Sequence, residues 1–169
     1  MKVILDKYQL QVTIERLAYQ LIENFADLSS VAIIGIQPRG IHLSDKIVEQ
    51  LKKISPDSKI KYGKMDITFY RDDIRKELHK PNQTDISFSL EDKNVILIDD
   101  VLYTGRTIRA SLDAILAFGR PKKVELCILI NRRLSRELPI QPDYCGKSID
   151  SLISEKVKVE WDKGQVVLY

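Results

Sequence analysis

The chain has 169 residues, of which 44% are hydrophobic and 30% are charged, and its formal net charge is +3. These values predict one globular domain and exclude the strong overall basicity of a dedicated nucleic-acid-binding protein. No apolar run approaches the roughly 20 residues of a membrane span, and Asp6 and Lys7 follow the apolar start too early for a signal peptide. The two cysteines, Cys127 and Cys145, form no C-x-x-C pair, which indicates a cytoplasmic protein without structural disulfides.

The first third of the chain alternates between helix and strand patterns. Residues 6–25 carry apolar side chains at helical spacing, and residues 31–36 form a continuous apolar run typical of a buried parallel strand. A second helix is predicted over residues 41–54. The turn between them, Gln37-Pro38-Arg39-Gly40, can present backbone N–H groups to an anion.

Residues 60–70 alternate in part, which predicts an extended strand with Gly63 as a bulge. Residues 71–89 are polar and charged and show no sustained pattern. A segment of this length without structure of its own is usually a functional lid or disordered, so we expect a flexible loop there.

The most informative stretch is residues 94–107, N-V-I-L-I-D-D-V-L-Y-T-G-R-T. Its apolar run, residues 95–98, predicts a buried central strand, and Asp99 and Asp100 stand at the carboxyl end of that strand. A helix follows from Thr107 to about residue 118. Ligands of open α/β sheets bind beyond the carboxyl ends of the strands, so this stretch predicts a ligand site.

The residue types in this stretch suit a ribose phosphate. Gly105 lets the backbone approach a ligand closely, and the N–H groups of the helix N-terminus with the Thr104 and Thr107 hydroxyls suit a phosphate. Arg106 adds positive charge.

The two carboxylates suit the other half of the same ligand. Asp99 and Asp100 can accept hydrogen bonds from sugar hydroxyls or hold a hydrated Mg²⁺. The alternative is an ordinary turn whose aspartates cap the helix. That alternative accounts for one or two of the residues, but it does not account for two adjacent carboxylates directly after a buried strand.

The rest of the chain adds one more core strand and a tail. Residues 123–130 predict another buried strand, and residues 156–161 and 165–169 predict a hairpin. The alternation of strands and helices up to residue 130 predicts an α/β fold with a parallel sheet, and the remainder is expected to form a small cap.

The core motif resembles a known family. V-I-L-I-D-D-V-L-Y-T-G-R-T is similar to the 13-residue phosphoribosyl pyrophosphate (PRPP) motif of type I phosphoribosyltransferases, in the form typical of the pyrimidine operon attenuator/uracil phosphoribosyltransferase family. Residues 66–73, 119–121 and 136–140 resemble the same family, so the similarity covers essentially the whole chain. The resemblance implies one domain over residues 1–169, with a core of about 1–130, a flexible loop of about 71–89 and a C-terminal cap of about 131–169.

The resemblance implies that the chain transfers the phosphoribosyl group of PRPP to uracil, giving UMP and diphosphate, with Mg²⁺. It gives catalytic roles to Asp99, Asp100 and Arg39, and the two aspartates would also hold Mg²⁺, directly or through water. Arg132 and the backbone near Val157 are the implied contacts to the base. The residues expected to bind PRPP or the nucleotide are Pro38, Arg39, Gly40, Arg71, Asp99, Asp100, Val101, Leu102, Tyr103, Thr104, Gly105, Arg106 and Thr107.

Two other functions stay open on the sequence. Purine-type members of the wider class often carry a carboxylate where this chain has Tyr103, which argues against a purine and against an obvious general base, but a phosphoribosyltransferase for another base is not excluded. The second alternative is a UMP-responsive regulator that binds pyrimidine-operon messenger RNA with little or no catalysis. The intact motif favours the enzyme, and the resemblance also implies a dimer or larger homo-oligomer. The basic residues available for RNA phosphates are Arg132, Arg133, Arg136 and Lys147.

Overall fold

The computed structural model describes residues 1–72 and 83–169, and its centre is a five-stranded sheet in the order β3-β2-β4-β5-β6. All four neighbouring pairs are parallel, so the predicted α/β fold is confirmed. The strands are β2 (Val31–Ile36), β3 (Lys61–Met65), β4 (Asn94–Leu102), β5 (Lys123–Arg132) and β6 (Tyr144–Ile149).

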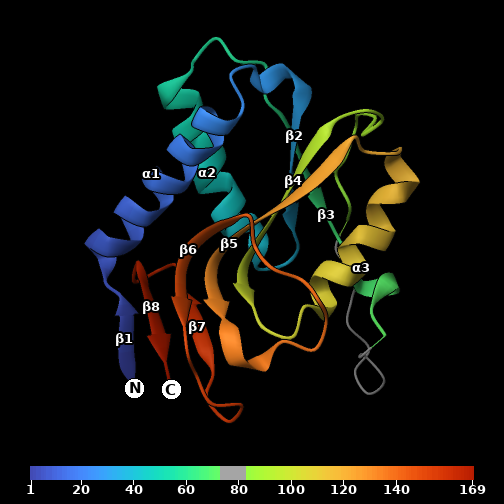
Figure 1. Ribbon diagram of the computed structural model, residues 1–169. Helices are drawn as coiled ribbons and strands as arrows, with labels where there is room; N and C mark the ends of the chain where they lie inside the picture. Colours follow the sequence, from blue (N-terminus) through green and yellow to red (C-terminus); the bar gives the residue numbers. More distant parts are fainter. Residues whose placement is uncertain (73–82) are drawn as a thin grey trace.

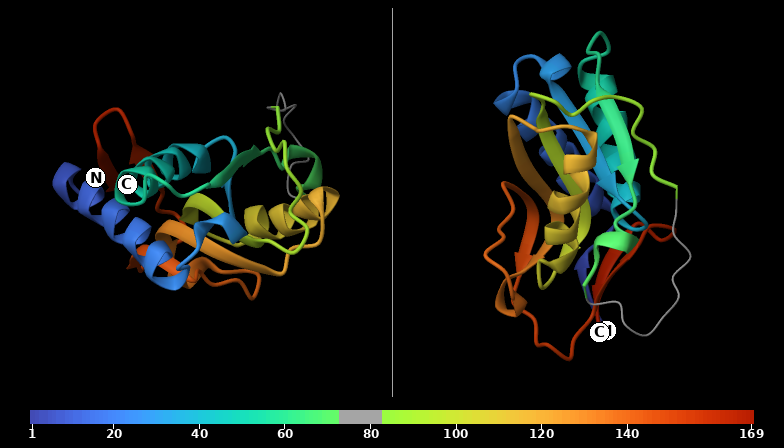
Figure 2. Two further views of the ribbon diagram at one scale, coloured as in Figure 1. Left: turned by 90° about the horizontal axis from the view of Figure 1, so that it is seen from above. Right: turned by 90° about the vertical axis from the view of Figure 1, so that its right-hand side faces the viewer.

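Helices cover both faces of this sheet, as Figures 1 and 2 show. Helix α1 (Lys7–Asn24) and helix α2 (Gly40–Ile54) lie on one face, and α3 (Arg106–Ile115) lies on the other and continues as a 3₁₀ turn, Leu116–Phe118. Helix α1 begins where the sequence pattern predicts, because Asp6 accepts a hydrogen bond from the Gln9 N–H at 2.8 Å and the Gln9 side chain accepts one from the Asp6 N–H.

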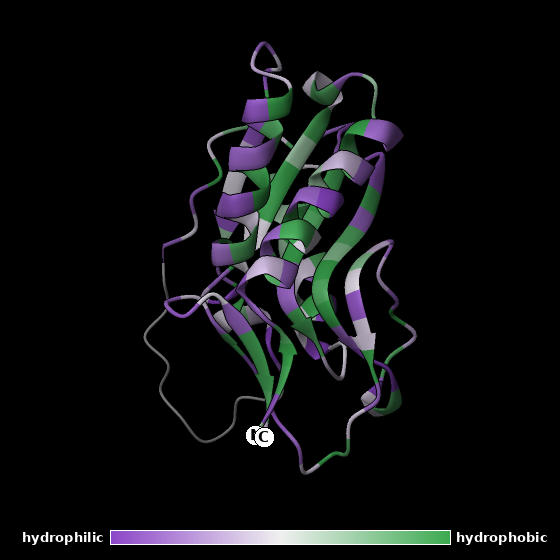
Figure 3. Cartoon of the chain, turned by 90° about the vertical axis from the view of Figure 1, so that its left-hand side faces the viewer, coloured by the Kyte–Doolittle hydropathy of each residue, from purple (hydrophilic) through white to green (hydrophobic). Residues whose placement is uncertain are grey.

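The two faces of the strands divide the core into two layers. On β4, Ile96 and Ile98 pack with the residues of α1 and α2, whereas Val95 and Leu97 pack with those of α3. Because side chains alternate along a strand, a strand covered on both faces needs a continuous apolar run, which is the pattern that the sequence shows. Figure 3 shows the apolar central strands behind helices whose exposed sides are polar.

The two ends of the chain meet in a second, three-stranded antiparallel sheet in the order β1-β8-β7. Its strands are β1 (Lys2–Leu5), β7 (Val157–Glu160) and β8 (Gln165–Leu168), and the predicted C-terminal hairpin is confirmed as β7–β8. The two termini lie side by side in Figure 1 because Lys2 pairs with Leu168.

The prediction of one extended strand over residues 60–70 is wrong beyond Met65, and Gly63 is not a bulge. The Asp66 carboxylate accepts hydrogen bonds from the Thr68 N–H and hydroxyl at 2.8 and 2.6 Å, and a 3₁₀ helix over Thr68–Tyr70 follows. Gly63 pairs with Ile34 in unbroken register. Its glycine is explained by close approach, since a Cβ there would lie 2.9 Å from the backbone oxygen of Asp85.

The smaller sheet does not coincide with the cap expected over residues 131–169. Strand β6 belongs to the five-stranded sheet, and β1, from the other end of the chain, belongs to the smaller one. Strand β6 was not predicted, because an edge strand pairs on one side only and its residues, Y-C-G-K-S-I, show neither an apolar run nor alternation.

The loop expected over residues 71–89 lies partly outside the described residues, which omit 73–82. Its last part runs along β3, where Lys64 and Asp85 form an antiparallel bridge. Within the described part of the chain, no helix is long and apolar enough to cross a membrane.

Candidate active site

The topology places one crevice at the carboxyl end of the parallel sheet. Strand β2 continues through α2 to β3 on one side, whereas its neighbour β4 continues through α3 to β5 on the other. Ligands of open α/β sheets bind where the connections diverge in this way. A cavity of about 430 Å³ opens there, and it is lined by Arg39, Arg71, Asp99, residues 101–107, Ile108 and Glu137.

Asp99 lines this cavity and Asp100 is buried next to it, and the protein itself leaves this acidic pair incompletely satisfied. Strand β4 runs to Leu102, so Asp99 and Asp100 lie within it rather than at its end, and they are only 7% and 3% exposed. Asp99 Oδ1 accepts the Asp100 N–H at 2.9 Å, but Asp100 Oδ1 is buried without a hydrogen-bond partner among the described residues. A buried polar atom without a partner is costly, and it points to a bound cation or hydrogen-bond donor.

Burial raises the pKa of Asp99 well above its ordinary value, and the neighbouring charge of Asp100 raises it further. Burial also raises the pKa of Asp100, and the nearby positive charge of Arg39 opposes the rise in both carboxyl groups. Since a positive charge favours the ionised form, a ligand that brings cationic character would return these groups to carboxylates.

The β2–α2 turn approaches the acidic pair from one side. A Cβ on Gly40 would lie 2.5 Å from the Ile98 backbone oxygen and 3.0 Å from the Asp99 Cα, so only glycine lets α2 begin against β4. The helix has no side-chain cap at its N-terminus. The Gln37–Pro38 peptide bond is cis, and the exposed Arg39 side chain lines the cavity.

The β4–α3 turn closes the other side of the cavity. Gly105 has a φ of 94° and precedes α3, which also lacks a side-chain cap. The Thr104 backbone oxygen accepts the Glu137 N–H at 2.9 Å, which ties this turn to the segment after β5.

Glu137 is a cavity residue that was not predicted as part of the site. Its carboxylate binds Arg106 Nε at 2.6 Å, and Arg106 also contacts Asp72 at 3.3 Å, so the expected charge of Arg106 is balanced by two carboxylates. Glu137 lies 31 residues from Arg106, and the only signal was its place in the segment 136–140 that resembles the family.

The two residues expected to contact the base do not line the cavity. Arg132 is buried and donates hydrogen bonds to Ser151 Oγ at 2.8 Å and to the backbone oxygens of Leu152 and Glu155, while its guanidinium stacks 4.2 Å from the Tyr103 ring centre. Val157 opens β7 and pairs with Leu168. Base binding through Arg132 and Val157 stays a prediction, although Arg132 supports Tyr103, which does line the cavity.

The other basic residues after β5 are engaged within the protein. Arg133 forms two hydrogen bonds to Asp150 at 2.8 and 2.7 Å, Arg136 donates to the Tyr103 backbone oxygen, and Lys147 donates to the Ile4 backbone oxygen at 3.0 Å. These contacts hold the C-terminal segments in place, but only the charge of Arg133 is balanced by a carboxylate, since Arg136 and Lys147 donate to neutral oxygens.

The acidic pair is chemically suited to Mg²⁺. The described residues contain no group of three or more histidine, cysteine, aspartate or glutamate side chains that could hold a metal alone. Mg²⁺ in phosphate-transfer sites, however, is commonly bound by one or two carboxylates together with substrate phosphates and water. Two buried carboxylates with one unpartnered oxygen fit that kind of site.

Comparison with known proteins places the chain among the phosphoribosyltransferases. The family model of the phosphoribosyl transferase domain matches residues 2–163. A hypoxanthine phosphoribosyltransferase structure from Staphylococcus aureus superposes with a TM-score of 0.70 at 20% identity, over 90% of this chain and 80% of that one. A hypoxanthine-guanine phosphoribosyltransferase from Bacillus anthracis gives 0.69 at 18% identity, over 89% and 82%. At such identities these structures show the fold alone.

Closer relatives narrow the class. The "Bifunctional protein PyrR" of Picosynechococcus sp. is 45% identical over 157 residues, which cover 92% of this chain and 88% of that relative. The protein of the same name from Haemophilus ducreyi is 45% identical over 160 residues, which cover 94% of this chain and 88% of that relative. The Enterococcus faecalis protein of that name is 40% identical over 164 residues, covering 96% and 90%. The chain belongs to the PyrR family of type I phosphoribosyltransferases.

Proposed function

We propose that the protein is a Mg²⁺-dependent uracil phosphoribosyltransferase that converts uracil and PRPP into UMP and diphosphate. The observation that carries the proposal is the buried acidic pair, Asp99 and Asp100, with an unpartnered oxygen. Helix α2 begins against Asp99 and helix α3 follows the same strand, and neither helix is capped by the side chain of its N-cap residue. PRPP has ribose hydroxyl groups, which need hydrogen-bond acceptors such as carboxylates. It also has phosphates at two ends, which suit the positive N-termini of two helices. Few other ligands combine these two requirements.

In this proposal each turn binds one end of PRPP. The 5′-phosphate binds the first N–H groups of α3 and the hydroxyls of Thr104 and Thr107, and the ribose hydroxyls donate to Asp99 and Asp100. The diphosphate lies at the N-terminus of α2 beside Arg39. Pro38 has no N–H, so it shapes this turn without donating to the phosphates.

The reaction breaks the bond between ribose C1′ and the diphosphate oxygen, forms a bond from C1′ to a ring nitrogen of uracil, and releases the proton of that nitrogen to the diphosphate or to water. Positive charge that develops on the ribose is favoured by the ionised acidic pair, and negative charge on the departing diphosphate is favoured by Arg39 and the α2 amides. When bound, Mg²⁺ supplies further positive charge to the diphosphate, and Asp99 and Asp100 would hold it, directly or through water. Tyr103 stands where purine-type members of the class often carry a carboxylate, so in this proposal positioning rather than a general base accounts for catalysis.

The test is UMP formation from uracil and PRPP with Mg²⁺, beside parallel reactions with hypoxanthine, guanine, adenine and orotate. We expect turnover with uracil. This activity should be lost in the Asp99→Asn/Asp100→Asn variant and retained in Asp57→Asn. Asp57 is exposed and lies in the turn after α2, away from the cavity, so its variant controls for the loss of a carboxylate. Preference for another base would contradict the assignment of uracil as the substrate. No turnover with any base would contradict the proposal that the protein is an enzyme.

A second candidate is a UMP-responsive regulator that binds pyrimidine-operon RNA. It is favoured by the 40–45% identity to relatives whose shared name states two functions. Its test is a filter-binding titration with a pyrimidine-operon leader RNA, with and without UMP, over a range of salt concentrations. Binding that strengthens with UMP and weakens with salt is expected, and equal binding of an unrelated RNA would contradict it. For either candidate function, we also propose that the protein forms a dimer or larger oligomer and is located in the cytoplasm.

A further inference from the structure

A second cavity lies away from the acidic pair, between α1, α2 and the turn of the β7–β8 hairpin. Its volume is about 310 Å³, at the lower end of the roughly 300–1,000 Å³ that is usual for ligand pockets. We call it the hairpin pocket. None of its lining residues lines the cavity at the carboxyl end of the sheet.

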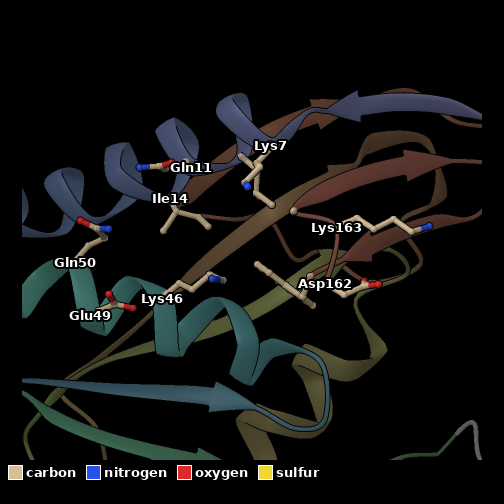
Figure 4. A pocket seen from close by; sticks show the side chains of 11 residues that line it. Lys7, Gln11, Ile14, Lys46, Glu49, Gln50, Asp162 and Lys163 are labelled. Carbon is tan, nitrogen blue, oxygen red and sulfur yellow. The ribbon is translucent and has the colours of Figure 1, made fainter.

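Positive charge faces this pocket from two helices. Figure 4 shows Lys7 of α1 and Lys46 of α2 extending toward the space between the helices and the hairpin turn, whereas Lys163 extends in another direction. Lys163 pairs with Glu160 at 3.3 Å, and the pocket residue Glu49 pairs with Lys53 at 2.7 Å. Among the described residues, Lys7 and Lys46 form no ion pair, although the pKa of Glu49 is lowered by its hydrogen bond to Lys53 and, to a smaller extent, by the charge of Lys46. Asp162 also lines the pocket, so the two lysines offer positive charge to an anion beside two carboxylates.

The hairpin turn packs against the aliphatic part of Lys7, which is otherwise exposed. Gly164 has a φ of 66°, and a Cβ added there would lie 3.2 Å from Lys7 Cγ, so the turn rests directly on the stem of this lysine. Asp6 caps α1 immediately before it. A lysine stem packed in this way loses less freedom when its ammonium binds a ligand, which favours binding.

The remaining walls suit a flat ring. Trp161 lines the pocket, Leu10 and Ile14 give it an apolar floor, and Gln11 and Gln50 add amide donors and acceptors. Aromatic rings pack favourably against an indole, and amides can bond the polar edge of a heterocycle. We propose that the hairpin pocket is a second ligand site for a small anion that carries a planar aromatic ring, which is the chemistry of a nucleoside monophosphate.

The pocket contains its own reporter, because Trp161 is the only tryptophan of the chain. The experiment titrates the full-length protein with AMP and follows tryptophan fluorescence, with adenosine and inorganic phosphate as separate probes. A saturable change with AMP is expected, stronger than with either part alone. Lys7→Gln/Lys46→Gln should weaken the apparent affinity by about tenfold, since each exposed charge pair contributes modestly. A matched control, Lys52→Gln/Lys59→Gln, removes the same charge from exposed positions outside the pocket and should leave the affinity unchanged.

The Asp99→Asn/Asp100→Asn variant distinguishes AMP binding in the hairpin pocket from AMP binding at the acidic pair. This variant should keep the fluorescence response to AMP. Three results would overturn the proposal. The first is no saturable response to AMP, and the second is an equal response to adenosine. The third is a response that survives in Lys7→Gln/Lys46→Gln and disappears in Asp99→Asn/Asp100→Asn. Thermal unfolding confirms that each variant is folded. UMP formation by Lys7→Gln/Lys46→Gln should be unchanged, so the outcome does not depend on whether the protein transfers phosphoribosyl groups.

Discussion

Two strand–turn–helix units, β2–α2 and β4–α3, flank the acidic pair and follow one plan, but different parts of the molecule hold them. The first rests on the sheet itself, because Gly40 touches the backbone of β4. The second is held by a segment distant in sequence, because Thr104 accepts the Glu137 N–H and Arg106 binds the Glu137 carboxylate.

If the protein binds PRPP as proposed, the two ends of PRPP meet turns that are held in different ways. The turn proposed for the diphosphate is held by the backbone packing of the core, which tolerates little change. The turn proposed for the 5′-phosphate is held by hydrogen bonds and an exposed ion pair, which can be altered without disturbing the sheet. We therefore expect substitutions at the first turn to cost stability and substitutions at the second to change ligand affinity first.

The largest effect is expected where the two units meet. Asp99→Asn/Asp100→Asn should lower the rate of UMP formation at least about 1,000-fold, equivalent to about 4 kcal/mol of transition-state stabilisation. The reason is that the two carboxylates proposed to accept the ribose hydroxyls and to hold Mg²⁺ both lose their charge. Steady-state kinetics measures the effect, and a rate within tenfold of the wild-type value would contradict the role of the pair.

Gly40→Ala should be the most destabilising change at the first turn. The added Cβ would lie 2.5 Å from the Ile98 oxygen, so α2 must shift, at a cost of about 1–3 kcal/mol in the free energy of unfolding. Urea unfolding measures it, and a loss of less than 0.5 kcal/mol, roughly the effect of an ordinary surface change, would contradict the contact.

Gly105→Ala should cost less, for a different reason. Its Cβ meets no atom closer than 3.4 Å, but the φ of 94° disfavours an L side chain by about 1–2 kcal/mol. Gly105→Asn is the matched variant, because asparagine tolerates positive φ better, and it should recover part of the loss. Equal losses for alanine and asparagine would contradict the conformational explanation.

Asp99→Asn alone should raise the stability of the ligand-free protein at neutral pH. Burial raises the pKa of Asp99 in the folded state, so the folded protein keeps its proton at pH values where the unfolded chain, with a pKa of about 3.9, has lost it. Stability therefore falls as the pH rises from that value through the raised pKa, and asparagine removes this fall.

The expected gain for Asp99→Asn is a rise of about 2–4 °C in melting temperature at pH 7, with little difference from the wild type near pH 4. Calorimetric scans at both pH values measure it. A variant less stable than the wild type at pH 7 would show that the acidic pair stabilises the fold, contrary to this account.

Glu137→Gln should have the smallest effect on stability, below about 1 kcal/mol, because the Arg106–Glu137 pair is substantially exposed. Its effect should appear instead in the KM for PRPP, since Arg106, in the turn proposed to bind the 5′-phosphate, loses a carboxylate that it contacts. An unchanged KM would mean that the second turn does not depend on this contact.

The sequence predicted the parts of the fold whose signal is local. Buried parallel strands such as β4 need continuous apolar runs, and capped amphipathic helices such as α1 carry their pattern and their start in adjacent residues. Strand β6 was missed because it is extended through its pairing with β5, which its own residues do not indicate. Strand β1 was missed because its partner, β8, lies at the other end of the chain.

The same distinction holds for the site. Asp99, Asp100 and the turn at residues 103–107 lie in one motif, whereas the contact of Gly40 with β4 and that of Glu137 with Arg106 exist only after folding. Arg132 was expected to contact the base, but three of its hydrogen bonds go to the segment 151–155, which no sequence pattern near Arg132 indicates.

The most direct test of the central claim is a crystal structure of the protein with UMP. The account predicts the 5′-phosphate at the N-terminus of α3, bonded to residues 104–107, and the ribose hydroxyls within hydrogen-bond distance of Asp99 and Asp100. A nucleotide whose phosphate lies at another place, or whose ribose does not contact the acidic pair, would contradict it.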